Sequence, residues 1–213
     1  MKKMKTKIMT IVVLSLLVFA ACKKDKKEDP APTNPAPTNQ GEVITTMKIY
    51  IKDSITGNPI TGSPFIFKDA DGDGGSAGGF LPNAVDSLIT LNESTTYLAE
   101  IILLDETKTP ADSISNEVVE EGQEHMFFFE QLNPTGTPYT TILTGSGVKI
   151  TYLDLDANSR GIGQQFKLRT YGSTGGVQHP FRVTLRHQPG TKDGTFAPGE
   201  TDVEIKFKVK VDL

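Results

Sequence analysis

The segment 203–211, near the end of the chain, alternates strictly between apolar and polar side chains. Its odd-numbered positions hold Val, Ile, Phe, Val and Val, and its even-numbered positions hold Glu or Lys. Because successive side chains of a β-strand point to opposite faces, this period of two predicts a strand with one buried face and one wet face. An amphipathic helix would instead repeat its apolar residues three and four positions apart. The segment therefore constrains the fold to contain a half-buried sheet.

The same alternation recurs in 43–51, 166–169 and 181–186. Two other segments, 97–104 and 126–129, are apolar at both parities, which predicts strands buried on both faces. Clusters of Gly, Pro, Asn and Asp separate these runs, as turns do. No segment has a sustained helical period, although 115–121 can form one helical turn. We therefore predict an all-β fold, an antiparallel immunoglobulin-like sandwich.

The Pro- and Gly-rich stretch 133–138 is the best candidate for a domain boundary. It predicts two small tandem β domains, an acidic one at 42–132 and a second at 133–213. The second domain carries basic residues on its outward strand faces, and these are Lys167, Arg169, Arg182, Arg186, Lys206, Lys208 and Lys210. Such residues protect strand edges from pairing. Alternatively, they form a basic face for anionic lipid, lipopolysaccharide or the acidic half.

Residues 1–21 have the pattern of a signal peptide. A Lys-rich start precedes an apolar stretch from Ile8 to Ala21, which is shorter than the roughly 20 residues that span a bilayer. The small residues Ala20 and Ala21 stand directly before Cys22, the only Cys in the chain, so no internal disulfide is expected. This arrangement resembles the lipobox of bacterial lipoproteins, in which the Cys is acylated and the preceding bond is cut. The alternative is an ordinary cleaved signal that leaves a free Cys.

Residues 22–41 are predicted to be the lipidated Cys followed by a Pro-rich tether. A mixed-charge run at 23–29 precedes two copies of Pro-Ala-Pro-Thr-Asn, at 30–34 and 35–39. Pro at this density favours extended polyproline II, with a rise of about 3.1 Å per residue. The tether would hold the β domain clear of the lipid headgroups. We expect a protein anchored to the outer membrane, on either its periplasmic side or the cell surface.

The strongest local motif for a cation is Asp69-Ala70-Asp71-Gly72-Asp73-Gly74. Alternating carboxylates and a Gly that permits a sharp turn suit an oxygen-preferring ion such as Ca²⁺. The motif resembles the first half of an EF-hand loop, but Phe80 occupies the twelfth position, so Asp86 would have to supply the missing ligand. The alternative is a polar turn rich in Asp and Gly. A weaker echo, Asp154, Asp156 and Asn158, is also explained by turn chemistry.

The three histidines offer a second kind of metal site. His125 follows several Glu residues, and His179 and His187 bracket one predicted strand at the same parity. If His125 and His187 meet in space, they can hold Zn²⁺. The alternative is that each is a strand-end residue bonded to backbone.

Motifs of catalysis are missing from the sequence. It contains no GxSxG, no HExxH and no phosphate-binding loop, and no pair of carboxylates is singled out for acid–base work. The chain also has no Trp, which disfavours a sugar-binding module. We therefore expect a protein that is not an enzyme.

Two segments of the body carry a family likeness. LNESTTYLAEIILLDETKTPADSISNEVVEEGQEHMFFF and VTLRHQPGTKDGTFAPGETDVEIKF resemble small uncharacterised outer-membrane lipoproteins of Gram-negative bacteria. Such proteins are often encoded beside TonB-dependent receptors, and some carry the label of a type 1 periplasmic-binding fold. That fold needs alternating helices and parallel strands, which this sequence does not show. The resemblance implies an accessory role in uptake.

These observations together predict a membrane-anchored, non-enzymatic binding lipoprotein that assists an outer-membrane transporter. Its expected partners are the membrane, through the lipid anchor, and an outer-membrane receptor, with no nucleic acid. The alternative is a structural or adhesive surface lipoprotein with Ca²⁺-stabilised loops.

The lipobox reading gives the first prediction. The wild-type chain expressed in a Gram-negative host should carry acyl groups on Cys22, whereas Cys22→Ala should remain unlipidated, because the sequence has no other thiol to accept the lipid. Mass spectrometry of the mature N-terminus checks this. An unmodified Cys22 in the wild-type protein would contradict the reading.

Overall fold

The computed structural model describes residues 42–72, 78–81, 88–133, 135 and 147–213. The predicted signal peptide, Cys22 and the tether lie outside these residues. The described elements are ten strands and one short helix: β1 (Thr46–Asp53), β2 (Phe65–Lys68), β3 (Gly79–Leu81), β4 (Leu88–Asn92), β5 (Thr96–Leu104), α1 (Ile114–Glu120), β6 (His125–Gln131), β7 (Gly147–Tyr152), β8 (Gln165–Tyr171), β9 (His179–His187) and β10 (Glu200–Asp212).

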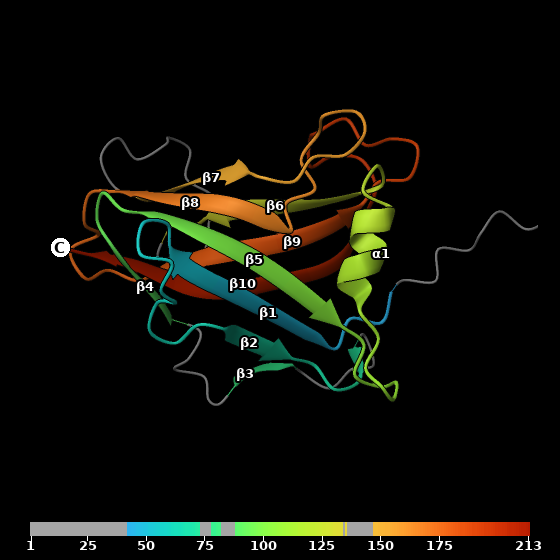
Figure 1. Cartoon of the computed structure of the whole chain (residues 1–213), viewed down its shortest axis with the longest axis horizontal. Coiled ribbons are helices and arrows are strands. Elements are labelled where there is room, and N and C mark those ends of the chain that lie inside the picture. Colours follow the sequence, from blue (N-terminus) through green and yellow to red (C-terminus); the bar gives the residue numbers. More distant parts are fainter. Residues whose placement is uncertain (1–41, 73–77, 82–87, 134, 136–146) are drawn as a thin grey trace, which may run out of the picture. The chain divides into compact units, whose positions relative to one another are not determined.

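The strands form two sheets that pack face to face (Figure 1). One sheet has six strands in the order β3-β2-β1-β5-β8-β7, and the other has four in the order β4-β10-β9-β6. All neighbours are antiparallel except β10 and β4, which are parallel. The prediction of an all-β protein is therefore confirmed.

The alternation at 203–211 is explained by the packing of β10. Ile205, Phe207 and Val209 are almost fully buried between the sheets, and the lysines between them face water. Phe207 lies opposite Phe181 of β9, and Ile205 lies opposite Val183. The core is built from such inward positions of both sheets, together with Ile114 and Val118 of α1. Many residues contribute to the stability of this core, since burying each large apolar side chain stabilises the fold by about 1.5–3 kcal/mol.

The expectation that 97–104 is buried on both faces is wrong. In β5 the inward residues Tyr97, Ala99, Ile101 and Leu103 are buried, while the residues between them are only half-buried. The physical reason is that β5 lies in the middle of a sheet whose outer side is not covered by another layer. Likewise, Met126 and Phe127 of β6 are buried but Phe128 and Phe129 are only partly so.

The predicted tandem domains are not confirmed. Strands from 42–132 and from 133–213 pair directly in both sheets, since β5 pairs with β8 and β6 pairs with β9. Residues 41–213 form one compact unit. The change in charge near residue 133 is therefore not a domain boundary, because strands from both sides of it pair with one another and share one core.

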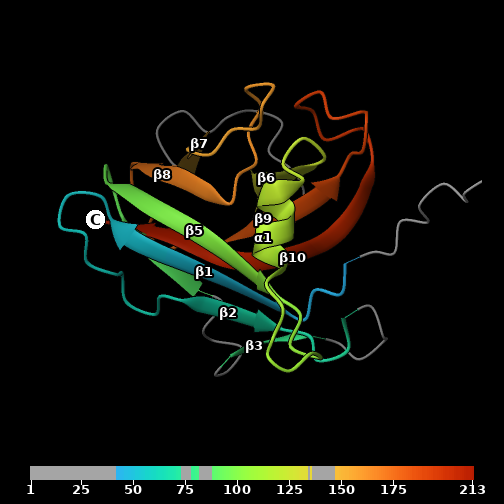
Figure 2. The same ribbon diagram turned by 45° about the vertical axis from the view of Figure 1, so that its right-hand side comes forward.

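Helix α1 has only seven residues and lies across one end of the sandwich (Figure 2). The hydroxyl of Ser115 accepts a hydrogen bond of 2.7 Å from the amide of Leu103, which fixes α1 to the end of β5. At this end β6 begins, β9 finishes and β10 begins. Among the described residues, no helix is both long and apolar enough to cross a membrane.

Candidate metal centre

His125 and His187 meet at the end of the sandwich covered by α1. They are direct cross-strand partners, His125 at the start of β6 and His187 at the end of β9. Their rings stack with centroids 4.5 Å apart and planes 10° from parallel. The two histidines therefore meet in space, as the sequence hypothesis required, because the register of β6 against β9 places them opposite each other. His179 lies at the other end of β9, opposite Val209, and takes no part.

Glu121 completes a group of three metal-ligand side chains. One ligand atom from each of Glu121, His125 and His187 lies within 4.8 Å of the other two. The turn after α1 brings Glu121 close, because the amide of His125 donates to the carbonyl of Glu121 over 3.2 Å. The Nδ1 atom of His125 lies 3.9 Å from the Glu121 carboxylate and has no hydrogen-bond partner among the described residues, although the His125 side chain is only 1% exposed.

This group fits the donor set of Zn²⁺. Two imidazole nitrogens and one carboxylate are common zinc ligands, at about 2.0–2.2 Å from the metal. Tetrahedral ligands at that distance lie about 3.3 Å apart, so small side-chain movements close the cluster around an ion. The carboxylate of Glu124 lies 3.3 Å from Nε2 of His187. It is close enough to serve as a fourth ligand of the ion or to orient the His187 ring.

His125 is in the protonation state that a metal needs. Burial, and then the neighbouring charge of His187, lower the pKa of His125 to about 4. The ring is therefore neutral at pH 7 and has a lone pair to donate.

Two further carboxylates face the opposite edge of the His125 ring. Nε2 of His125 lies 3.7 Å from Glu42 and 3.7 Å from Asp202. Burial, followed by repulsion from Asp202, Glu117 and Glu121, raises the pKa of Glu42 to about 7. Metal-binding histidines commonly direct their second nitrogen to a carboxylate, which orients the ring. Glu42 and Asp202 are placed for that role.

Sequence reasoning missed both of these residues, and Asp202 shows why. By simple alternation it belongs to the outward set of β10 with Glu204 and Lys206. The ladder between β10 and β9 shifts register between Thr201 and Val203, so Asp202 is an extra, bulged residue. A β-bulge turns a side chain to a new direction, and the Asp202 side chain is only 4% exposed. A bulge leaves no signal in the hydrophobic pattern.

Comparisons with known proteins add no family here. No protein-family model matches the chain, and no curated protein matches it.

A buried ion pair supports the turn that carries Glu121. The ammonium of Lys192 lies 3.0 Å from the carboxylate of Asp156, and both side chains are at most 1% exposed. The same ammonium donates a hydrogen bond of 2.7 Å to the carbonyl of Gly122. Burial lowers the pKa of Lys192. Burial alone would raise the pKa of Asp156, but hydrogen bonds from the Arg160 amide and from Lys192 hold the pKa of Asp156 below its usual value.

In the weaker cation motif, Asp154, Asp156 and Asn158, the contacts that the structure describes are those of a turn. Asp156 accepts amide hydrogen bonds of 2.8 Å from Asn158 and from Arg160, and Lys192 supplies its positive charge. Asp154 accepts bonds of 2.8 and 2.9 Å from the amides of Gly163 and Gln165. These carboxylates therefore already have their partners, as turn chemistry requires.

The stronger motif is described only in part, because Asp73 and Asp86 lie outside the described residues. Asp69 and Asp71 line a pocket of about 410 Å³ whose other acidic residues are Glu42, Asp202 and Glu204. The described lining contains no basic residue. Because Glu42 and Asp202 also face His125, the pocket adjoins the histidine cluster.

The buried ion pair gives the second prediction. Lys192→Met should lower the free energy of unfolding by about 3–5 kcal/mol, because Asp156 is left buried without its cation. Urea denaturation measures this. The matched control is Lys206→Met, which breaks an exposed pair with Glu204 and should cost no more than about 1 kcal/mol. Equal effects of the two substitutions would contradict the role assigned to Lys192.

Proposed function

We propose that this chain is a membrane-anchored, non-enzymatic binding lipoprotein whose β-sandwich captures a divalent transition-metal cation, with Zn²⁺ as the best fit. The observation that carries the proposal is the group of Glu121, His125 and His187, whose ligand atoms lie within 4.8 Å of one another. The three residues come from the turn after α1, from β6 and from β9.

The anchoring part of the proposal rests on the sequence. The apolar stretch that ends at Ala20-Ala21-Cys22 supports export and lipidation, and the Pro-rich repeat supports a tether. We place the protein at the outer membrane, with an outer-membrane receptor as its partner, because of the likeness to lipoproteins encoded beside TonB-dependent receptors. In this role the protein would hold the cation near the transporter.

We also propose that the sandwich is immunoglobulin-like in architecture. Two packed sheets with mostly antiparallel pairing support this. The parallel pairing of β10 with β4 makes it a variant of that arrangement.

Zinc binding is the third prediction. Isothermal titration of Zn²⁺ into the metal-free protein at neutral pH should show one site, and Zn²⁺ should raise the melting temperature, since a ligand that binds only the folded state stabilises it. Glu121→Gln should weaken the affinity by about tenfold or more, given that even changes outside the ligand set cost that much. The Glu121 side chain is 57% exposed, so this variant should fold normally.

The histidines supply the matched comparison for the zinc test. His187→Gln should abolish the Zn²⁺ response, whereas His179→Gln, at the far end of the same strand, should leave it intact. Absence of zinc binding in the wild-type protein, or equal losses in the two histidine variants, would overturn the proposed function.

A second candidate function is favoured by the acidic pocket. Five carboxylates, including those of Asp69 and Asp71, line it with no basic residue in the described lining. This composition suits Ca²⁺, which binds oxygen ligands. The chain would then be a structural or adhesive surface lipoprotein whose loops are stabilised by Ca²⁺.

The calcium alternative gives the fourth prediction. If it holds, Ca²⁺ up to about 10 mM should raise the melting temperature, because extracellular sites bind at about 10⁻⁴–10⁻³ M. Asp71→Asn with Asp73→Asn should remove the response. Glu120→Gln with Glu200→Gln, which neutralises two exposed carboxylates elsewhere, should preserve it. A wild-type melting curve that Ca²⁺ leaves unmoved would eliminate this candidate.

A further inference from the structure

The outer face of the six-stranded sheet is strongly basic. The described strands of this sheet place one acidic side chain, Glu100, among its outward positions. The basic side chains on the same face come from four strands and from both halves of the sequence: Lys48, Lys52, Lys68, Lys149, Lys167 and Arg169.

Four of these charges are not neutralised within the described part of the chain. No ion pair there involves Lys52, Lys149, Lys167 or Arg169, whereas Lys68 pairs with Glu106. Arg169 lies directly opposite Lys149 across the β8–β7 ladder. Like charges in directly opposite positions destabilise a sheet. The pairing of Lys149 with Arg169 therefore does not stabilise the fold, and a bound external anion would reduce the repulsion between their charges.

The outer face of the four-stranded sheet is different, although it also carries many basic residues. Lys206 pairs with Glu204 at 3.3 Å, and Lys210 pairs with Asp212 at 2.7 Å. Arg182 pairs with Glu130 and lies 3.8 Å from Glu204. The basic residues of this face are largely balanced by its own carboxylates, as expected for edge protection and solubility.

Exposed aromatic and aliphatic groups lie among the charges of the six-stranded face. Tyr50 and Tyr171 are 42% and 41% exposed, and the guanidinium of Arg169 lies 5.6 Å from the centre of the Tyr171 ring. Tyr rings with basic neighbours are typical of surfaces that rest at the polar boundary of a bilayer.

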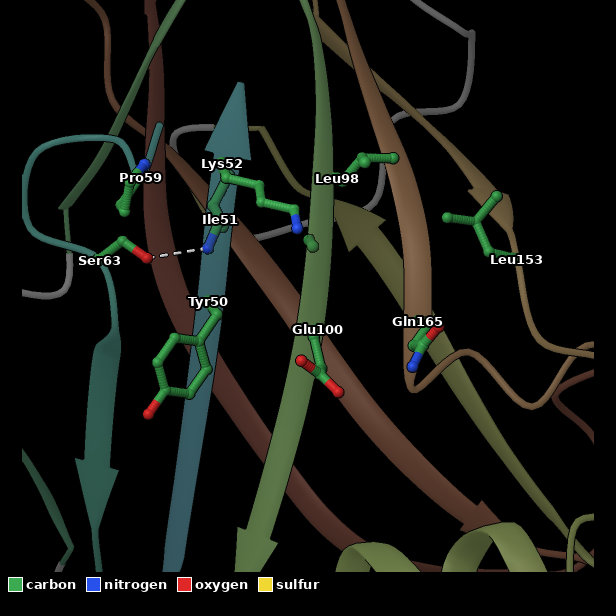
Figure 3. A pocket seen from close by; sticks show the side chains of 10 residues that line it. Tyr50, Ile51, Lys52, Pro59, Ser63, Leu98, Glu100, Leu153 and Gln165 are labelled. Atoms are coloured by element: carbon green, nitrogen blue, oxygen red, sulfur yellow. Dashed lines mark hydrogen bonds between the residues drawn. The ribbon is translucent and has the colours of Figure 1, made fainter. Parts of the chain in front are cut away.

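The same face is hollowed between β1, β5 and Leu153 (Figure 3). The hollow has a volume of about 360 Å³ and is lined by Tyr50, Lys52, Leu98 and Glu100. The Ser63 hydroxyl accepts a bond of 2.9 Å from the Ile51 amide and holds the loop at its rim. The hollow therefore places the apolar side chain of Leu98 beside the ammonium of Lys52, with the carboxylate of Glu100 also in its lining.

We propose that this face docks onto the anionic phospholipid surface of a membrane. Its unpaired basic residues are complementary to lipid phosphates, and each Lys or Arg near an anionic bilayer contributes to binding. Twenty positions separate Cys22 from Glu42, so a lipidated Cys22 would confine the domain to one membrane surface, and the basic face would supply the attraction that draws the domain down to the headgroups. The docking does not depend on the metal centre, which lies at the α1 end of the sandwich.

Vesicle co-sedimentation tests this fifth prediction. The chain from residue 22, with Cys22→Ser to remove lipid attachment, should bind phosphatidylcholine vesicles only when phosphatidylglycerol is added. Binding should weaken as salt is raised, because salt screens exposed charges. The face variant Lys52→Gln with Lys167→Gln and Arg169→Gln should bind about a hundredfold more weakly.

The matched control removes three positive charges from the other sheet. Lys206→Gln with Lys208→Gln and Lys210→Gln changes the net charge equally and leaves the tether unchanged, and it should bind within about threefold of the parent chain. Equal losses in both variants would show that net charge alone drives binding. If the face variant binds as well as the parent chain, the lysines of the tether are responsible for vesicle binding. Either result, or a parent chain that ignores phosphatidylglycerol, overturns the proposal.

Discussion

The buried ammonium of Lys192 holds together the end of the sandwich that carries the candidate metal centre. It lies against Asp156 in the loop between β7 and β8, and it donates a hydrogen bond to the carbonyl of Gly122 in the turn between α1 and β6. Both charges are removed from water, so each is stable only because the other is present and their remaining bonds are made by backbone groups. Glu121 directly precedes Gly122 in the turn after α1, and His125 begins β6 three residues after Gly122, so the ammonium of Lys192 holds the turn that joins these two residues.

In the candidate metal centre, packing sets the chemical state of the side chains. Burial keeps His125 neutral, with its pKa near 4, and the cross-strand register places His187 against it. Burial, and then repulsion from the surrounding carboxylates, raises the pKa of Glu42 to about 7. A divalent cation would reverse that repulsion, since it supplies positive charge where negative charge is crowded. The arrangement thus suits a site that gains from binding a cation.

Charge is distributed unevenly over this β-sandwich. Acidic side chains gather around the α1 end, with Glu42, Glu121 and Asp202 near the histidines. Basic side chains without an ion pair in the described part of the chain gather on the outer face of the six-stranded sheet. A chain with net charge −4 can therefore present a cation-attracting end and an anion-attracting face at the same time. The two surfaces fit a protein that holds a cation while resting on a membrane.

The sequence by itself determined the all-β class and the inward face of β10, because a period of two over 203–211 is a local property of the chain. It also singled out His125 and His187 as candidate metal ligands, and the structure places these two residues side by side. Only the tertiary structure decided that the two halves share one core, that Asp156 pairs with Lys192, and that a bulge turns Asp202 toward His125. These features depend on strand register and on contacts between distant residues, which hydrophobic periodicity does not encode.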